Sequence, residues 1–144
     1  MFLMNLSEEK RTIIINEFNK VYDLMKNTNN ISEKIFYFSA SHAMVSRVLN
    51  IEFDPLLILI HSVLQTTYSN INSFINSISN KQNMFFTIPK NYFDILEKTL
   101  KELTQSVENN NDDKIYRDLQ KLSILGYITT GNGNYLYKKG SIKL

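Results

Sequence analysis

Apolar residues recur with the spacing of an α-helix along most of the chain, and the first such stretch covers residues 7–26. Ile14, Phe18, Val21 and Met25 form its single stripe, at intervals of three and four positions. Ser7 precedes the stripe and offers a hydroxyl that can cap a helix. These residues predict an amphipathic helix with one apolar face.

A second helix is predicted to start after Ser32, and its apolar face is broad. One stripe consists of Ile35, Phe38, His42, Val45 and Leu49, and a second beside it consists of Phe36, Ala40 and Ala43. A face of this width should be buried on more than one side.

Asp54 and Pro55 predict the start of a third helix, because aspartate caps well and proline suits the first helical turn. The stripe of this helix consists of Leu57, His61, Leu64, Tyr68, Ile71, Ile75 and Ile78. A polar loop follows at 79–83. The aromatic and β-branched residues 84–88 then predict a short strand that stops at Pro89.

Pro89 suits the first turn of a fourth helix of about 19 residues. Its stripe consists of Phe93, Leu96, Leu100, Leu103 and Val107. The polar segment 108–113 interrupts the pattern, so the helix should end there.

A fifth helix is predicted at residues 112–125, with Asn111 or Asp112 as its cap and Gly126 as the glycine that ends it. Residues 127–139 follow, with Gly131, Asn132 and Gly133 between two short β-like segments. This is a strong hairpin pattern in a sequence.

Charge is unevenly distributed along the chain. Residues 114–144 hold six basic and one acidic residue, a net charge of +5, whereas residues 1–113 hold ten basic and thirteen acidic residues, a net charge of −3. The C-terminal segment is therefore the candidate surface for a polyanion.

From residue 54 onward the predicted order is helix, strand, helix, turn, helix, strand, turn, strand. This order resembles the winged helix-turn-helix proteins that bind DNA. The resemblance rests on LKELTQSVENNNDDKIYRDLQKLSILGYI as second helix, turn and recognition helix, and on GYITTGNGNYLYKK as the wing. It implies a mostly α fold with a small β-hairpin wing, preceded by extra N-terminal helices.

The fifth predicted helix has two distinct faces. Its core face consists of Ile115, Leu119, Leu122 and Leu125. Its opposite face consists of Asp113, Arg117, Gln120 and Lys121, with Lys114 at the edge of that face. Arginine pairs with guanine and glutamine with adenine in the major groove. Asp118 lies near the edge of the core, so we expect it to form a local structural bond. Ile124 lies on the outer side, where the wing or a neighbour should cover it.

Contacts from the flanking segments complete the predicted DNA-binding site. The Asn-rich turn, with Asn111, offers donors to phosphate oxygens. The wing would contact the backbone or the minor groove through Asn132, Asn134, Tyr135, Lys138 and Lys139.

The resemblance divides the chain into N-terminal helices at 1–50 and a winged helix-turn-helix domain at 51–144. MarR-like regulators are similar in having flanking helices that dimerise, although their wing carries an Asp and Arg pair that this hairpin lacks. We expect a homodimer in which residues 1–50 set the spacing of the two DNA-binding surfaces. The alternative is that these helices pack within the core of a monomer.

Other function classes find little support. The chain has no cysteine, phosphate-binding glycine loop, nucleophile elbow or spaced carboxylate pair, so no enzyme activity, metal or cofactor is expected. His42 and His61 are expected to be satisfied core histidines. The N-terminus lacks signal-peptide features and the apolar run 56–60 is too short to span a membrane, so a cytoplasmic protein is expected. The aromatic residues at 36–38 and Tyr68 could line a pocket between helices, so a small-molecule effector stays an open alternative to simple core packing.

The sequence therefore predicts a dimeric, sequence-specific double-stranded DNA-binding protein, most simply a transcriptional regulator. Two alternatives remain open. One is a plasmid or viral replication or partition factor, and the other is a winged-helix module that binds protein.

Overall fold

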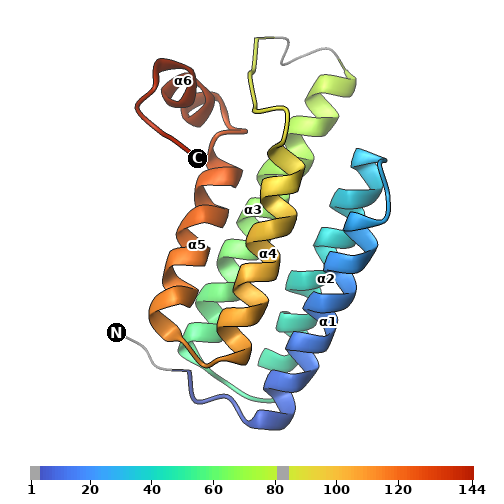
Figure 1. Cartoon of the computed structure of the whole chain (residues 1–144), viewed down its shortest axis with the longest axis vertical. Helices are drawn as coiled ribbons and strands as arrows, with labels where there is room; N and C mark the ends of the chain where they lie inside the picture. The colour runs from blue at the N-terminus through green and yellow to red at the C-terminus, as the bar shows by residue number, and fades with distance from the viewer. Residues whose placement is uncertain (1–3, 81–84) are drawn as a thin grey trace.

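A computed structural model describes residues 4–80 and 85–144, and the regular elements in these two ranges are all helices (Figure 1). The six helices are α1 (Glu8–Lys26), α2 (Ile31–Leu49), α3 (Pro55–Ser79), α4 (Tyr92–Glu108), α5 (Asp112–Tyr127) and α6 (Gly131–Lys139).

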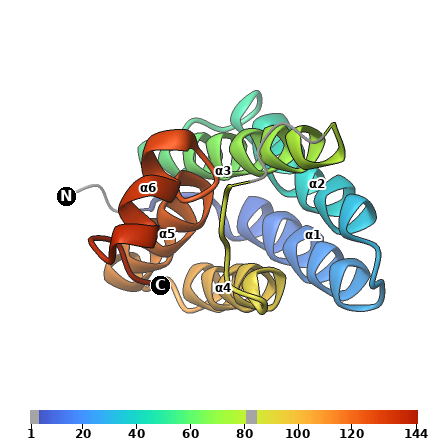
Figure 2. The ribbon, with the colours of Figure 1, turned by 90° about the horizontal axis from the view of Figure 1, so that it is seen from above.

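The five long helices form a closed ring in the order α1, α2, α3, α5, α4 (Figure 2). Each packs against two others, and α4 closes the ring by packing against α1. One predicted apolar stripe of each long helix points mainly into the ring, where Phe18, Phe38 and Leu64 are fully buried, whereas the second stripe of α2, with Phe36, faces outward. Among the described helices, the short helix α6 packs only on α5, at one end of the ring.

Side chains cap the starts of several helices, among them positions that the sequence predicts. Ser7 Oγ accepts the Lys10 N–H at 3.4 Å, and Asp54 Oδ1 accepts the Leu57 N–H at 2.9 Å. Asn111 Oδ1 accepts the Lys114 N–H at 3.2 Å, so Asn111 caps α5. Each bond satisfies an amide that has no partner within its own helix.

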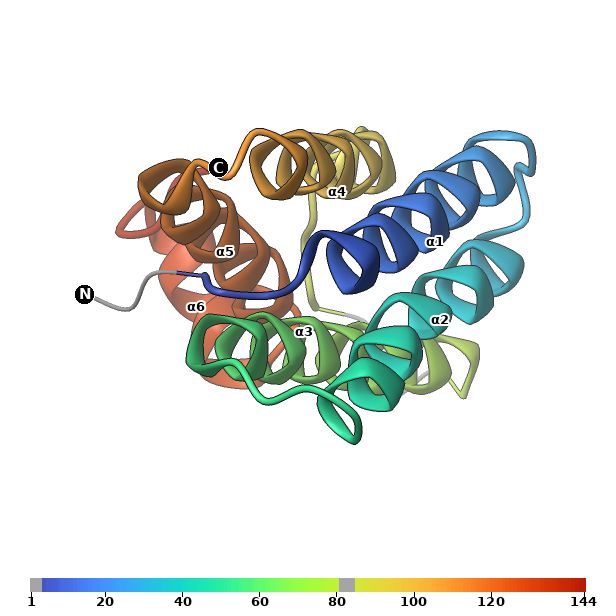
Figure 3. The same ribbon diagram turned by 90° about the horizontal axis from the view of Figure 1, so that it is seen from below.

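Residues 4–7 run across one end of the ring (Figure 3) and bond to the start of α5 and to the turn between α2 and α3. The Met4 N–H donates to Asp112 at 3.3 Å, and the Asn5 N–H donates to Asp54 at 2.7 Å. Ser7 Oγ donates to Glu52 at 2.8 Å. Met4 is itself buried, so this segment covers one end of the core.

The predicted wing is wrong. Residues 127–139 contain the last residue of α5, a turn and the helix α6, and no strand lies in the described ranges. Residues 85–88 of the predicted strand at 84–88 have no regular structure, and residue 84 lies outside the described residues. The fold is therefore an all-helical ring and not a winged helix-turn-helix.

The GNGN sequence begins a helix because Gly133 and Asn134 make contacts that a hairpin does not need. Thr130 Oγ1 accepts the Gly133 N–H at 3.1 Å and caps α6. A Cβ at residue 133 would lie 1.8 Å from the Tyr127 carbonyl oxygen, so only glycine fits there. The helix ends at Gly140, where φ is 88°.

Gly126 was expected to end the fifth helix, but α5 continues through it to Tyr127. Glycine occurs at this position for another reason, a close approach of two helices. A Cβ at residue 126 would lie 3.0 Å from the Cα atom of Thr67 in α3. Thr67 Oγ1 also donates to the Leu122 carbonyl at 3.1 Å, which strengthens this contact between α3 and α5.

The predicted boundary between residues 50 and 51 falls in the turn between α2 and α3, which pack against each other within the ring. The dimerising role expected for residues 1–50 stays a prediction. Among the helices that are described, none combines the length and apolar character needed to cross a lipid bilayer.

Candidate interaction surface

The outer face of α5 carries the cations that the sequence analysis assigned to DNA. Lys114, Arg117 and Gln120 are exposed, whereas the core face with Ile115, Leu119, Leu122 and Leu125 is buried as predicted. Asp113 lies beside Lys114 and Arg117 around a hollow of about 400 Å³ near the start of the helix. A carboxylate at this point reduces the attraction for phosphate.

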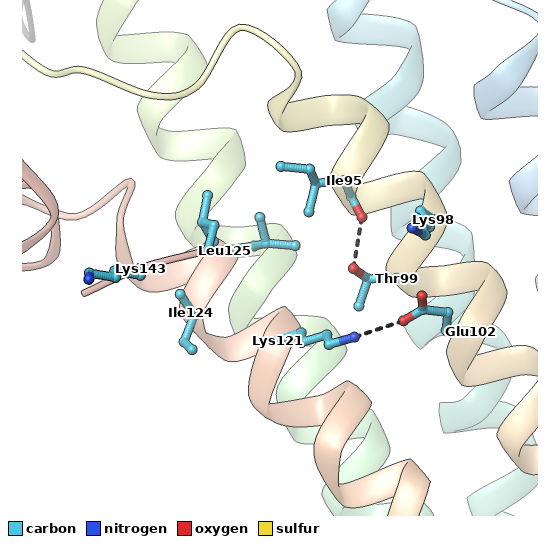
Figure 4. A pocket seen from close by; sticks show the side chains of 9 residues that line it. Ile95, Lys98, Thr99, Glu102, Lys121, Ile124, Leu125 and Lys143 are labelled. Carbon is cyan, nitrogen blue, oxygen red and sulfur yellow. Dashed lines mark hydrogen bonds and ion pairs between the residues drawn. The ribbon is translucent and has the colours of Figure 1, made fainter.

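Lys121 faces α4, as Figure 4 shows. Its ammonium group donates to Glu102 Oε2 at 3.1 Å and so forms an ion pair between α5 and α4. This pair lies in a pocket of about 320 Å³ whose lining also includes Lys98, Ile124 and Lys143. Lys121 is thus half of an internal pair, and its charge is less available to a polyanion than its position in the sequence indicates.

Asp118 is buried, and its carboxylate accepts a hydrogen bond from Ser106 Oγ on α4 at 2.6 Å. The local structural bond expected for this residue is confirmed. Burial raises the pKa of Asp118, although the hydrogen bond from Ser106 opposes the shift. Asp118 therefore belongs to the packing of α4 on α5 and not to an outward-facing site.

The residues predicted for the wing lie on α6, where Asn134, Tyr135, Lys138 and Lys139 line one hollow together with Phe85. Asn134 is only 2% exposed; its amide donates to the carbonyls of Ile128 and Thr87, and its Oδ1 accepts the Thr87 N–H. It ties the segment before α4 to α6, so it is not placed to contact DNA. Lys138 Nζ donates to the Phe85 carbonyl at 2.9 Å.

Four of these residues, all within α6, are exposed: Asn132, Tyr135, Lys138 and Lys139. The ammonium group of Lys139 lies 5.9 Å from the centre of the Tyr135 ring. Figure 1 shows α6 at one end of the molecule, beyond the C-terminal end of α5.

A groove between α3 and α5 is the feature that sequence reasoning missed. Its volume is about 700 Å³. Apolar side chains from both helices line it, namely Leu59, Val63, Tyr116, Leu119 and Ile124. The polar side chains around it are Arg117, Gln120, Lys121 and Ser123, with no acidic residue among the lining residues. The groove has an apolar floor and a positively charged edge.

The α3 side of this groove is formed by a helix without a formal charge. Residues 55–79 include no Asp, Glu, Lys or Arg, although α3 has an exposed side with Ser62, Gln65 and Thr66. Charged side chains are depleted at the centres of protein interfaces because their desolvation is unfavourable. This charge-free run is the one sequence signal that could have indicated the groove.

His42 of α2 and His61 of α3 lie together, with ring centres 5.9 Å apart, and the Tyr68 ring lies 5.4 Å from His42. Both histidines are half-buried, so they lie at the edge of the core and not inside it as the sequence predicts. Burial and the neighbouring His61 lower the pKa of His42. No cluster of three potential metal-ligating side chains occurs in the described part of the chain.

Comparisons with known proteins identify no relative. No protein-family model, curated protein or solved structure matches this chain. The groove and the outer face of α5 are therefore interpreted from their own chemistry.

Proposed function

We propose that this protein is a binding module whose α3–α5 groove receives an amphipathic helix from a partner protein, with acidic residues beside the apolar stripe of that helix. The observation that carries the proposal is the groove itself: an apolar floor between two helices, with the exposed Arg117 at its edge and no acidic lining residue. Grooves of this kind are a recurring way to bind helices.

Each part of the groove supports one property of the partner. Leu59 and Val63 favour apolar side chains at helical spacing, because their burial is the main source of affinity. The exposed Arg117 favours a carboxylate at the rim, which affects association rate and orientation more than affinity, whereas the Lys121 ammonium already pairs with Glu102. The uncharged α3 lets a partner approach without desolvating a charge on that side.

A second candidate function is contact with double-stranded DNA through the outer face of α5. It is favoured by the exposure of Lys114 and Arg117 and by the net charge of +5 in residues 114–144. Without a wing, such binding would depend mainly on phosphate contacts. The regulator and the replication or partition roles remain predictions within this second candidate, as does a small-molecule effector.

Two designed peptides test the protein-binding proposal. Both form the same amphipathic helix with leucines on one face. One carries Glu and the other Lys beside that face. Fluorescence anisotropy should detect binding of the acidic peptide only. If neither peptide binds, or both bind equally, the proposal is wrong.

Variants of the protein separate the two candidates. Val63→Ser removes apolar contact and should weaken the acidic peptide by about 5- to 30-fold. It should leave binding to a labelled random 20-base-pair duplex unchanged. Lys114→Ala lies outside the groove lining and is the matched control, because it should weaken only the duplex. Duplex binding that falls steeply with salt, with no binding of the acidic peptide, would favour DNA instead.

A further inference from the structure

The outer face of α2 carries large apolar side chains that the ring does not bury. Phe36 is 72% exposed and Ile51, just past the end of α2, is 73% exposed. The chain continues in a helical turn to Ile51, whose N–H donates to the Val48 carbonyl at 2.9 Å. Phe53, also 73% exposed, follows in the same turn region.

The residues between these anchors are small. At about 100° per residue, Phe36, Ala40, Ala43, Arg47 and Ile51 fall on one outward stripe, opposite the buried side with Phe38 and Val45. Ala43 is exposed and Ala40 is half-buried. The sequence pattern requires burial of this second stripe, yet the ring of one chain buries only the first.

We propose that a second copy of this chain covers the stripe, with the two α2 helices antiparallel and crossing at Ala43. The stripe is self-complementary in that arrangement. If Ala43 faces Ala43 of the second copy, Phe36 on each chain lies against the region of residues 50 and 51 on the other. A two-fold interface requires this reciprocity, in which residue i meets j and j meets i.

Size and charge both favour the antiparallel arrangement. Alanines at the crossing point let two helices approach closely, while the bulky side chains at both ends fill the gaps where the helices diverge. Arg47 is the one charged residue of the stripe. It lies four residues from the crossing point, so the two arginines would be about 12 Å apart, beyond the screening length of about 8 Å at physiological salt. A parallel pair would instead bring Arg47 against Arg47.

The proposed interface leaves the α3–α5 groove free. In the ring, α2 adjoins α1 and α3 and does not contact α5. A dimer through α2 would therefore present two grooves, and a partner with two helices would gain affinity from bivalent binding. The dimer does not depend on the groove having any particular occupant.

Sedimentation velocity on the full chain over a concentration series tests the dimer. The wild type should dimerise, and Phe36→Ser should raise the dimer dissociation constant by at least about 100-fold, because each interface contains the residue twice. Phe85→Ser is the matched control, since Phe85 is 84% exposed and lies outside α2. A wild type that stays monomeric at about 100 μM, a concentration at which even weak dimers form, overturns the proposal.

A disulfide trap tests the geometry, and the chain has no native cysteine to interfere. Ala43→Cys should give a covalent dimer on mild oxidation, because a disulfide forms only when the two Cα atoms are within about 7 Å. Ser69→Cys, an exposed position on α3, should not. A dimer that persists in Phe36→Ser, or in which Ala43→Cys does not cross-link, would place the interface elsewhere and overturn this proposal.

Discussion

Lys34 of α2 and Glu97 of α4 form an ion pair inside the ring, although their helices are not neighbours in it. Lys34 Nζ also donates to the Met25 carbonyl at the end of α1, at 2.7 Å. Both side chains are nearly fully buried. The pair thus connects three helices at the end of the ring where α1 leads into α2.

Removing one partner of this pair should lower the free energy of unfolding much more than removing both. Lys34→Met leaves the Glu97 carboxylate buried without a cation, which should lower the free energy of unfolding by about 3–5 kcal/mol. The double variant Lys34→Met/Glu97→Leu replaces the pair by apolar contacts and should recover most of that loss. Urea unfolding followed by circular dichroism measures both, and equal midpoints for the single and double variants would contradict the expectation.

Gly133 and Gly131 offer a matched comparison at the start of α6. Gly133→Ala would place a methyl group 1.8 Å from the Tyr127 carbonyl oxygen, whereas an added Cβ at Gly131 meets nothing within 4 Å. We expect Gly133→Ala to release α6 from the end of α5. Gly131→Ala should be neutral or stabilising by up to about 1 kcal/mol, because alanine favours a helix.

Hydrogen exchange of the α6 amides measures this difference. Protection should disappear in Gly133→Ala and persist in Gly131→Ala. Equal protection in the two variants would show that the contact with Tyr127 does not hold α6 in place.

Local signals were sufficient to predict the five long helices, though not α6. The stripe of Ile14, Phe18, Val21 and Met25 is buried as expected, and the caps at Ser7 and Asp54 are confirmed. Periodicity and capping depend on residues within a few positions of each other, so a sequence contains them in full.

The wing was predicted wrongly because distant contacts decide the structure of residues 127–139. Asn134 bonds to Thr87, 47 positions away, and Gly133 is required by a close contact with Tyr127. A glycine-rich segment has the same sequence whether its glycines form a tight turn or avoid a steric clash with a neighbouring residue. The α3–α5 groove was missed for a related reason, since no local pattern indicates that Val63 and Ile124 line one groove.

The packing of α5 on α3 should be sensitive to the size of residue 126. A methyl group there would lie 3.0 Å from the Thr67 Cα atom, so the helices would have to separate by a few tenths of an ångström. Gly126→Ala should lower the free energy of unfolding by about 1–3 kcal/mol, as overpacking does, despite the better helix propensity of alanine. Thermal unfolding tests this, and a raised midpoint temperature would contradict it.

The pair His42 and His61 should make stability depend on pH near neutrality. Burial, together with the charge of His61, lowers the pKa of His42 from its ordinary value of 6.5, so the folded chain accepts a proton at this site less readily than the unfolded chain. The stabilising effect of a neutral His42 is present above pH 6.5 and is lost as the pH falls through the lowered folded-state pKa. The free energy of unfolding of the wild type, minus that of His42→Gln, should therefore decrease between about pH 7.5 and 5.5. His61→Gln is the control. It removes the charge of His61 but keeps His42 buried, so the same difference measured in the His61→Gln background should still decrease with falling pH, by a smaller amount. A difference that stays constant across this range would mean that His42 has the same pKa in the folded and unfolded chains.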